Sequence, residues 1–220
     1  MPCCQSNYLQ MPFLNMKKIP FIFLFFLVNL SNQTLANNTK VAEQLKNRLQ
    51  EIKTLEIIFE QQVLEQNGRL NSVSSGKLYL SRPNKLRWEY TSPQKQTIIA
   101  DGTYIWIYDE DLEQASSSFQ RLSVRGTPAE ILLNPEALEK KYNVEPLGEN
   151  KIILTPKKTG KYRWLSISFT KNGLLEKFEM ENKLEQRIRF NFYNEKRNTP
   201  LDKKLFIFEP PEGTDILDDY

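Results

Sequence analysis

The stretch Ser81-Arg82-Pro83-Asn84-Lys85-Leu86-Arg87-Trp88-Glu89-Tyr90 is the most informative part of the chain. In its second half, Leu86, Trp88 and Tyr90 alternate with charged residues, which is the period of a β-strand that has one apolar face and one face in water. Pro83 ends or bends the preceding strand and fixes the local backbone. The sequence therefore predicts a half-buried strand with Arg82 just ahead of it.

Further strands are expected on both sides of this stretch. Alternating residues predict a strand from Leu55 to Leu64, and Asn67-Gly68 and Asn172-Gly173 are typical hairpin turns. The other expected strands cover residues 76–80, 97–100, 104–108, 112–119, 142–146, 151–155, 164–169, 174–180, 187–193 and 204–208.

Two helical regions accompany the strands. Asn38 or Thr39 can cap an N-terminal helix, whose apolar stripe is Val41, Leu45, Leu49 and Ile52. A mid-chain insert follows the first six strands, with Thr127-Pro128 opening a helix over 129–133 and Asn134-Pro135 opening another over 136–141. Ile131, Leu132 and Leu133 are too many consecutive apolar residues for one stripe, so they either belong to a core or contact an apolar ligand.

These elements predict a mainly β fold with two covering helical regions. About eleven or twelve antiparallel strands make a sheet long enough to curl, and an unclosed β-barrel with helices over its mouth buries the inner face. Strand positions hold most of the aromatic residues, which are 11% of the chain. The pattern leaves open whether they line a hydrophobic cavity or fill a solid core.

The first 36 residues are interpreted as an upstream extension and a cleavable signal peptide. Met16-Lys17-Lys18 is a basic start, residues 19–30 are almost wholly apolar, and Thr34-Leu35-Ala36 resembles a cleavage site. The apolar run is short for a membrane crossing, which needs about 20 residues, although an uncleaved anchor remains the alternative. Residues 37–220 are then expected to form one domain in an exported compartment.

The composition of residues 37–220 excludes several classes of function. The chain has no histidine, and both cysteines, Cys3 and Cys4, precede Met16. We therefore expect no disulfide, no zinc site of the usual kind, no cofactor and no histidine-dependent catalysis. Without Lys17 and Lys18, the chain has 28 basic and 27 acidic residues, which gives a net charge of +1. This balance gives no electrostatic argument for a nucleic-acid partner.

Three polar features are candidates for function. The acidic group Asp109, Glu110, Asp111 and Glu113 could suggest a carboxylate-dependent hydrolase, but an exposed hairpin tip is the favoured interpretation. The basic turn Lys157, Lys158 and Lys161 is either a solvated loop or a docking patch for an acidic partner or membrane. Arg82 is either an ordinary surface arginine or a donor to helix-end carbonyls that holds a lid closed.

An ordered set of segments resembles the outer-membrane lipoprotein carrier family, LolA. The segments are 76–90, Asp101-Gly102-Thr103-Tyr104-Ile105-Trp106-Ile107-Tyr108, Leu112-Glu113-Gln114-Ala115, Thr127-Pro128, Leu154-Thr155-Pro156-Lys157 and 206–215. The resemblance implies an unclosed barrel whose cavity shelters lipoprotein acyl chains in the periplasm. It also implies an inner-membrane ABC transporter and an outer-membrane receptor as partners, and a monomeric carrier.

The resemblance also assigns roles by position. Arg82 matches the lid-latching arginine, and Leu86, Trp88 and Tyr90 match the strand that faces the cavity. Leu45 and Leu49 fall on the first lid helix, and Ile131, Leu132 and Leu133 on the second. A related lipid- or lipoprotein-sensing domain of the same fold is the alternative.

Two segments depart from the family pattern. Residues 181–186 lack the usual hairpin glycine, and the chain ends soon after Asp215, so any C-terminal extra strand is expected to be short or missing.

Overall fold

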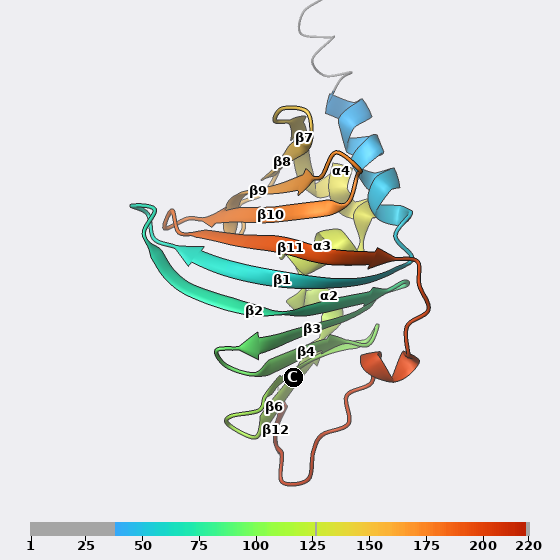
Figure 1. Ribbon diagram of the computed structural model, residues 1–220, viewed down its shortest axis with the longest axis vertical. Helices are drawn as coiled ribbons and strands as arrows, with labels where there is room; N and C mark the ends of the chain where they lie inside the picture. The colour runs from blue at the N-terminus through green and yellow to red at the C-terminus, as the bar shows by residue number, and fades with distance from the viewer. Residues whose placement is uncertain (1–37, 126, 219–220) are drawn as a thin grey trace, which may run out of the picture. The chain divides into compact units, whose positions relative to one another are not determined.

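Twelve strands pair into one unclosed sheet in the computed structural model, which describes residues 38–125 and 127–218 (Figure 1). Their order across the sheet is β12-β6-β5-β4-β3-β2-β1-β11-β10-β9-β8-β7. All neighbours are antiparallel except β12 and β6, which are parallel. The bounds are β1 Thr54–Leu64, β2 Leu70–Ser81, β3 Lys85–Ser92, β4 Gln96–Ala100, β5 Tyr104–Asp109, β6 Gln114–Phe119, β7 Tyr142–Pro146, β8 Lys151–Pro156, β9 Tyr162–Phe169, β10 Leu175–Asn182, β11 Arg187–Arg197 and β12 Asp215–Asp218.

Short helices lie between the two halves of the sheet along the chain. They are α2 (Gln120–Ser123), α3 (Pro128–Leu133), η1 (Pro135–Ala137) and α4 (Leu138–Lys141), and they lie on one face of the curved sheet (Figure 1). An N-terminal helix over residues 38–50 runs beside the β7–β10 half. The predicted mainly β, unclosed sheet with few helices is therefore confirmed. The expected signal peptide lies outside the described residues.

The buried face of the sheet and the helices share one hydrophobic core. On β1, Leu55, Ile57 and Phe59 are fully buried, as strand alternation predicts. Of the predicted apolar stripe, Leu45 and Leu49 lie on the N-terminal helix and are at most 1% exposed, Val41 is partly buried, and Ile52 is buried but lies after the last helical residue. Burial of this stripe against the sheet is what holds a short helix in place, since helices of this length are marginal alone.

Several predicted boundaries are wrong. Residues 204–208 do not form a strand but the short 3₁₀ helix η2 (Lys203–Phe206), because the carboxylate of Asp202 accepts a hydrogen bond from the Lys204 backbone and caps a turn there. Strand β6 begins at Gln114, not Leu112, because Asp109 accepts backbone hydrogen bonds at the preceding turn.

Other elements were not anticipated by the sequence patterns. The extra strand near the C-terminus, expected to be short or missing, is the four-residue β12; α2 was not predicted, and the expected helix over 136–141 divides into η1 and α4. The N-terminal helix already includes residues 38 and 39, so neither residue is its cap. In the hairpin without glycine, Glu185 takes a φ of 61° and the side chain of Asn182 accepts hydrogen bonds from two backbone N–H groups.

The charged face of β3 has a structural partner. Arg87 pairs with Glu89, and its Nη1 donates to the carbonyl of Leu205, 3.3 Å away. Close by, Phe208 stacks on Trp106 with ring centroids 5.1 Å apart. The segment that follows β11 therefore covers part of the outer face of β3–β5, on its way to β12.

Gly76 on β2 lies at a close approach of three strands. A Cβ atom at this position would lie 1.8 Å from the backbone oxygen of Glu89 and 2.7 Å from Cζ of Phe59. Gly76→Ala should therefore destabilise the fold by about 3 kcal/mol or more, at the upper end for overpacked cores, because backbone cannot move aside as a flexible side chain can. Chemical denaturation measures this. Ser72→Ala on the exposed part of β2 is the control, and equal midpoints for the two variants would contradict the packing.

Glu179 on β10 predicts a loss of stability in acid. Burial raises the pKa of this carboxyl, but hydrogen bonds from Lys151 and Arg189, each 2.8 Å long, together with their charges, outweigh burial and hold the pKa below its usual 4.5. A lowered carboxyl pKa stabilises the folded state above the unfolded pKa, and this contribution is lost as the pH falls through the folded pKa.

Glu179→Gln should therefore lower the melting temperature at neutral pH and differ less from the parent at a pH of about 3. The exposed Glu176→Gln serves as the control. A constant difference between parent and Glu179→Gln at the two pH values would contradict the ion-pair explanation.

Candidate functional site

Arg82 joins the C-terminal ends of the two covering helical regions. Its Nε donates to the carbonyl of Ile52 at 2.8 Å, and its Nη2 donates to the carbonyls of Leu49 at 3.0 Å and of Leu132 at 2.7 Å. Its Nη1 donates to Leu133 at 3.1 Å. Carbonyls at helix C-termini lack intrahelical donors and carry partial negative charge. They therefore accept the hydrogen bonds of the Arg82 guanidinium and stabilise its positive charge.

The position of Arg82 follows from the local strands. Its backbone N–H donates to the carbonyl of Lys53 at 2.9 Å, directly after the last residue pair of β1 and β2. This places the side chain at the end of the N-terminal helix. Burial lowers the pKa of Arg82, but a guanidinium stays charged at any physiological pH.

An apolar pocket of about 400 Å³ lies between the sheet and the α2–α3 segment. Its volume is at the lower end of the roughly 300–1,000 Å³ typical of ligand pockets. Strands β3, β4, β5, β10 and β11 supply most of its wall. The lining residues are Gln61, Leu86, Trp88, Tyr90, Ile98, Ala100, Ile105, Ile107, Ser123, Val124, Thr127, Pro128, Ala129, Leu133, Tyr162, Met180, Ile188 and Phe190.

The rings of Trp88, Tyr90 and Phe190 line one part of this apolar pocket, and Phe59 packs behind them. The ring of Phe59 lies 5.0 Å from Trp88, 5.3 Å from Tyr90 and 5.8 Å from Phe190, measured between centroids. Trp88 and Phe190 are themselves 5.0 Å apart at an angle of 74°. Such edge-to-face contacts fix the rings, so the wall is pre-formed.

Tyr90 and Trp88 also carry polar groups in this largely apolar wall. The hydroxyl of Tyr90 donates to Oε1 of Gln61 at 2.8 Å, and burial raises the pKa of Tyr90 to about 12, although the nearby indole of Trp88 opposes the rise. The Nε1–H of Trp88 is buried and makes no hydrogen bond of normal geometry to any described residue. A buried donor without such a partner is uncommon in folded proteins.

The expected cavity residues divide into three groups. Leu86, Trp88, Tyr90 and Leu133 line the apolar pocket. Leu49, Ile131 and Leu132 are buried in the hydrophobic core without lining it. Leu45 instead faces a second pocket.

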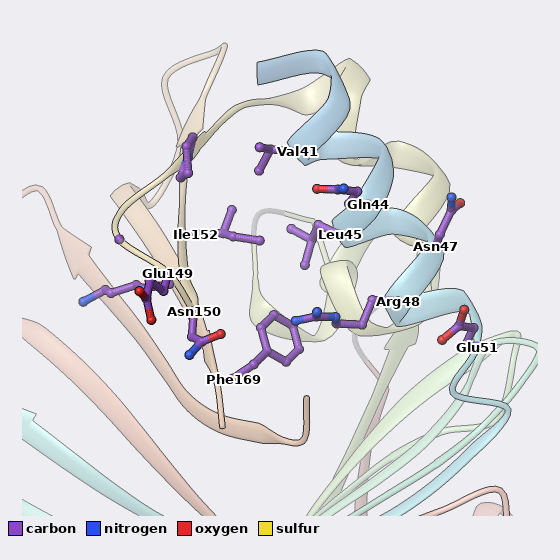
Figure 2. Close-up of a pocket in the computed structure, with 13 residues that line it drawn as sticks. Val41, Gln44, Leu45, Asn47, Arg48, Glu51, Glu149, Asn150, Ile152 and Phe169 are labelled. Carbon is purple, nitrogen blue, oxygen red and sulfur yellow. The ribbon is translucent and has the colours of Figure 1, made fainter. Parts of the chain in front are cut away.

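The second pocket, of about 500 Å³, lies between the N-terminal helix and the β7–β8 hairpin. Figure 2 shows Val41, Leu45 and Ile152 pointing toward one another at its apolar end. The guanidinium of Arg48 lies over the ring of Phe169, 4.4 Å from its centroid, as Figure 2 also shows. Because polar and apolar groups alternate around it, this pocket is less suited to an acyl chain than the apolar pocket.

The two other polar candidates, the basic turn and the acidic group, lie at the surface. Lys157, Lys158 and Lys161 are exposed, and Lys157 donates to the carbonyl of Glu139 at 2.7 Å. The acidic group at the tip of the β5–β6 hairpin is largely exposed, and Glu110 pairs with Lys95. No three acidic side chains within residues 38–125 and 127–218 are grouped so as to hold a metal ion.

Sequence reasoning missed part of the pocket wall. Met180, Ile188 and Phe190 come from β10 and β11, far from the stretch around Trp88 in sequence. The alternation of Ile188, Phe190 and Phe192 carried the signal, but it does not say which other strand these residues face.

Among the described residues, no helix is long and apolar enough to cross a membrane.

Comparison with known proteins gives a consistent result. Residues 50–209 match the family model described as outer membrane lipoprotein carrier protein LolA. The chain is 36% identical over 186 residues to the outer-membrane lipoprotein carrier protein of Methylococcus capsulatus, covering 82% of this chain and 89% of that protein. Its identity to the carrier of Xanthomonas oryzae pv. oryzae is 35% over 175 residues, covering 76% and 83%.

A solved structure shares the fold. An uncharacterized conserved protein from Thermus thermophilus superposes with a TM-score of 0.53 at 12% identity, covering 81% of this chain and 99% of that one. At this level of identity, the likeness concerns the fold alone.

The contacts of Arg82 predict how the N-terminal helix opens. Arg82→Leu removes four hydrogen bonds of about 0.5–1.5 kcal/mol each, so backbone amides over residues 42–50 should exchange with solvent at least about tenfold faster. Native-state hydrogen exchange measures this. Arg82→Lys keeps the charge but not the planar fork and should give an intermediate rate. Unchanged helix exchange in Arg82→Leu, with the sheet intact, would contradict the role of these bonds.

Proposed function

Because this chain belongs to the LolA family of outer-membrane lipoprotein carrier proteins, we propose that it shelters lipoprotein acyl chains in the apolar pocket while it carries them through the periplasm. The observation that carries the proposal is the apolar pocket itself, which is covered by the α2–α3 segment, with Arg82 bonded to the end of α3. It is a lipoprotein chaperone, and the proposal concerns how its residues do this work.

The physical need for a carrier is clear. Each buried acyl methylene gains about 0.8 kcal/mol, so an acylated protein does not leave a membrane for water unaided. The carrier must replace that burial without holding the chain as tightly as a close-packed core would. A pre-formed wall of aromatic rings with open volume beside it meets this condition.

Arg82 has the role of a latch in this proposal. It donates to the ends of the N-terminal helix and of α3, so both are held down together. An apolar pocket of about 400 Å³ is small for several acyl chains, and larger cargo requires these helices to move. Leu49, Ile131 and Leu132, now in the core, would become cavity residues on that movement.

The remaining roles follow from the family. We assign the chain to the periplasm after removal of residues 1–36, with an inner-membrane ABC transporter as donor of cargo and an outer-membrane receptor as acceptor. Lys157, Lys158 and Lys161 form an exposed basic turn suited to an acidic docking partner. The proposal includes no catalytic step and a monomeric carrier.

A charge in the pocket should stop transfer without unfolding the protein. Ile107 on β5 lines the apolar pocket yet is 37% exposed, whereas Ile58 on β1 is 38% exposed and lies outside the pocket. In cells depleted of the parent protein, Ile107→Glu should leave mature lipoproteins in the inner membrane, and Ile58→Glu should restore their delivery. Membrane fractionation measures their distribution.

Two outcomes would contradict the proposal. Normal delivery after depletion, with no variant supplied, would remove the carrier function. Normal delivery by Ile107→Glu would remove the apolar pocket from that function. Leu86→Glu is a harsher companion variant, because Leu86 is 2% exposed; its global unfolding would indicate that this wall is part of a solid core.

A further inference from the structure

A third, basic pocket lies directly beside the apolar one. Its volume is about 380 Å³, and three cationic side chains line it: Arg121 of α2, Arg125 just after α2, and Lys141 of α4. The acidic residue in its wall is Glu130, which is buried and pairs with Lys141. Three cations against one carboxylate give the basic pocket a net charge of +2.

Two of the positive charges in the basic pocket are not neutralised by ion pairs within the described residues. Neither Arg121 nor Arg125 has an ion-pair partner in the part of the chain that the structure describes, and both are exposed. By contrast, Arg163, Arg187, Arg189 and Arg197 on the sheet each pair with a glutamate. Arg121 and Arg125 line the same pocket without an ion-pair partner among the described residues, and guanidinium groups bond phosphate in a bidentate manner, so the two side chains are suited to bind an anion.

The backbone around the basic pocket is fixed by Gln120. Its Oε1 accepts from the backbone of Gly102, and its Nε2 donates to the carbonyl of Asn84, both at 2.8 Å. Gln120 is 6% exposed, so these bonds are protected from water. Helix α2 is thereby held against the β2–β3 and β4–β5 turns, directly before Arg121.

The apolar and basic pockets meet at two residues. Val124 and Leu133 line both. A molecule with an apolar chain and an anionic group separated by a short linker therefore has both of its parts matched by neighbouring surfaces. This is the arrangement of a phospholipid, whose phosphate follows directly on its acylated glycerol.

We propose that the basic pocket is a phosphate subsite, through which the protein binds a phosphate-bearing lipid whose acyl chains occupy the apolar pocket. The inference rests on the proposed function for its apolar half and adds a second class of ligand to it. The phosphate contacts Arg121 and Arg125, while Lys141 remains with Glu130 at the back of the pocket. The acyl chains lie against Trp88 and Phe190.

The test compares two short-chain lipids that differ only in the phosphate. Binding of short-chain phosphatidic acid and of the diacylglycerol with the same chains is measured by isothermal titration calorimetry. The parent protein should bind phosphatidic acid at least about tenfold more tightly, because hydrogen bonds to charged groups are the strong ones. The double variant Arg121→Gln/Arg125→Gln should lose this preference and keep its affinity for diacylglycerol.

The matched control is Lys171→Gln/Lys183→Gln, which removes two exposed positive charges elsewhere and should keep the preference. Equal affinity of the parent for both lipids would overturn the phosphate subsite and leave the proposed carrier function untouched. A preference that survives in the arginine variant, or that disappears equally in the lysine control, would also overturn it.

Two further arms separate the remaining outcomes. Glycerol 1-phosphate, which has no acyl chain, should bind far more weakly than phosphatidic acid; equal binding would identify a site for free phosphate esters and overturn the lipid assignment. Failure of both lipids to bind would overturn the inference together with the acyl-chain pocket on which the proposed function rests.

Discussion

The four hydrogen bonds of one guanidinium group hold the covering helices of this protein against its sheet. Arg82 reaches the carbonyls of Ile52, Leu49, Leu132 and Leu133, which belong to two helical regions far apart in sequence. A planar guanidinium with five donors can serve both helix ends at once, which the single ammonium of a lysine cannot do in the same geometry. Arg82 therefore connects the ends of both helical regions, in addition to the burial of Leu45 and Leu49 that packs the N-terminal helix against the sheet.

The energies of this closure suit a carrier. Net contributions of about 0.5–1.5 kcal/mol for each bond are small beside the gain from burying an acyl chain, at about 0.8 kcal/mol for each methylene. Cargo can therefore offset the loss of the bonds, and their re-formation favours release. The helices also carry their own apolar residues, such as Leu49 and Ile131, which are buried when the structure is closed. Closing without cargo thus leaves little apolar surface in water.

Much of the fold was predictable because its strands are half-buried. Alternation in β1, β3 and β11 identifies both the strand and its inner face, and the apolar stripe of the N-terminal helix requires a surface such as this. The segment after β11 was not predictable, because Phe206 and Phe208 resemble a strand while Asp202 caps a turn there and Phe208 packs on Trp106. The partner strands of the pocket wall were also hidden, since Met180 and Phe190 meet Trp88 only through the curvature of the sheet.

Leu133 brings the three parts of the site together. Its carbonyl accepts a hydrogen bond from Arg82, and the residue lines both the apolar and the basic pocket. A ligand that displaces this side chain from either pocket also moves the end of α3, to which the Arg82 bonds are anchored. Because hydrogen bonds weaken steeply with distance and angle, a small shift of Leu133 is enough to loosen the closure. In the proposed carrier, occupation of the pockets and release of the helices are therefore linked through Leu133, at the end of a two-turn helix.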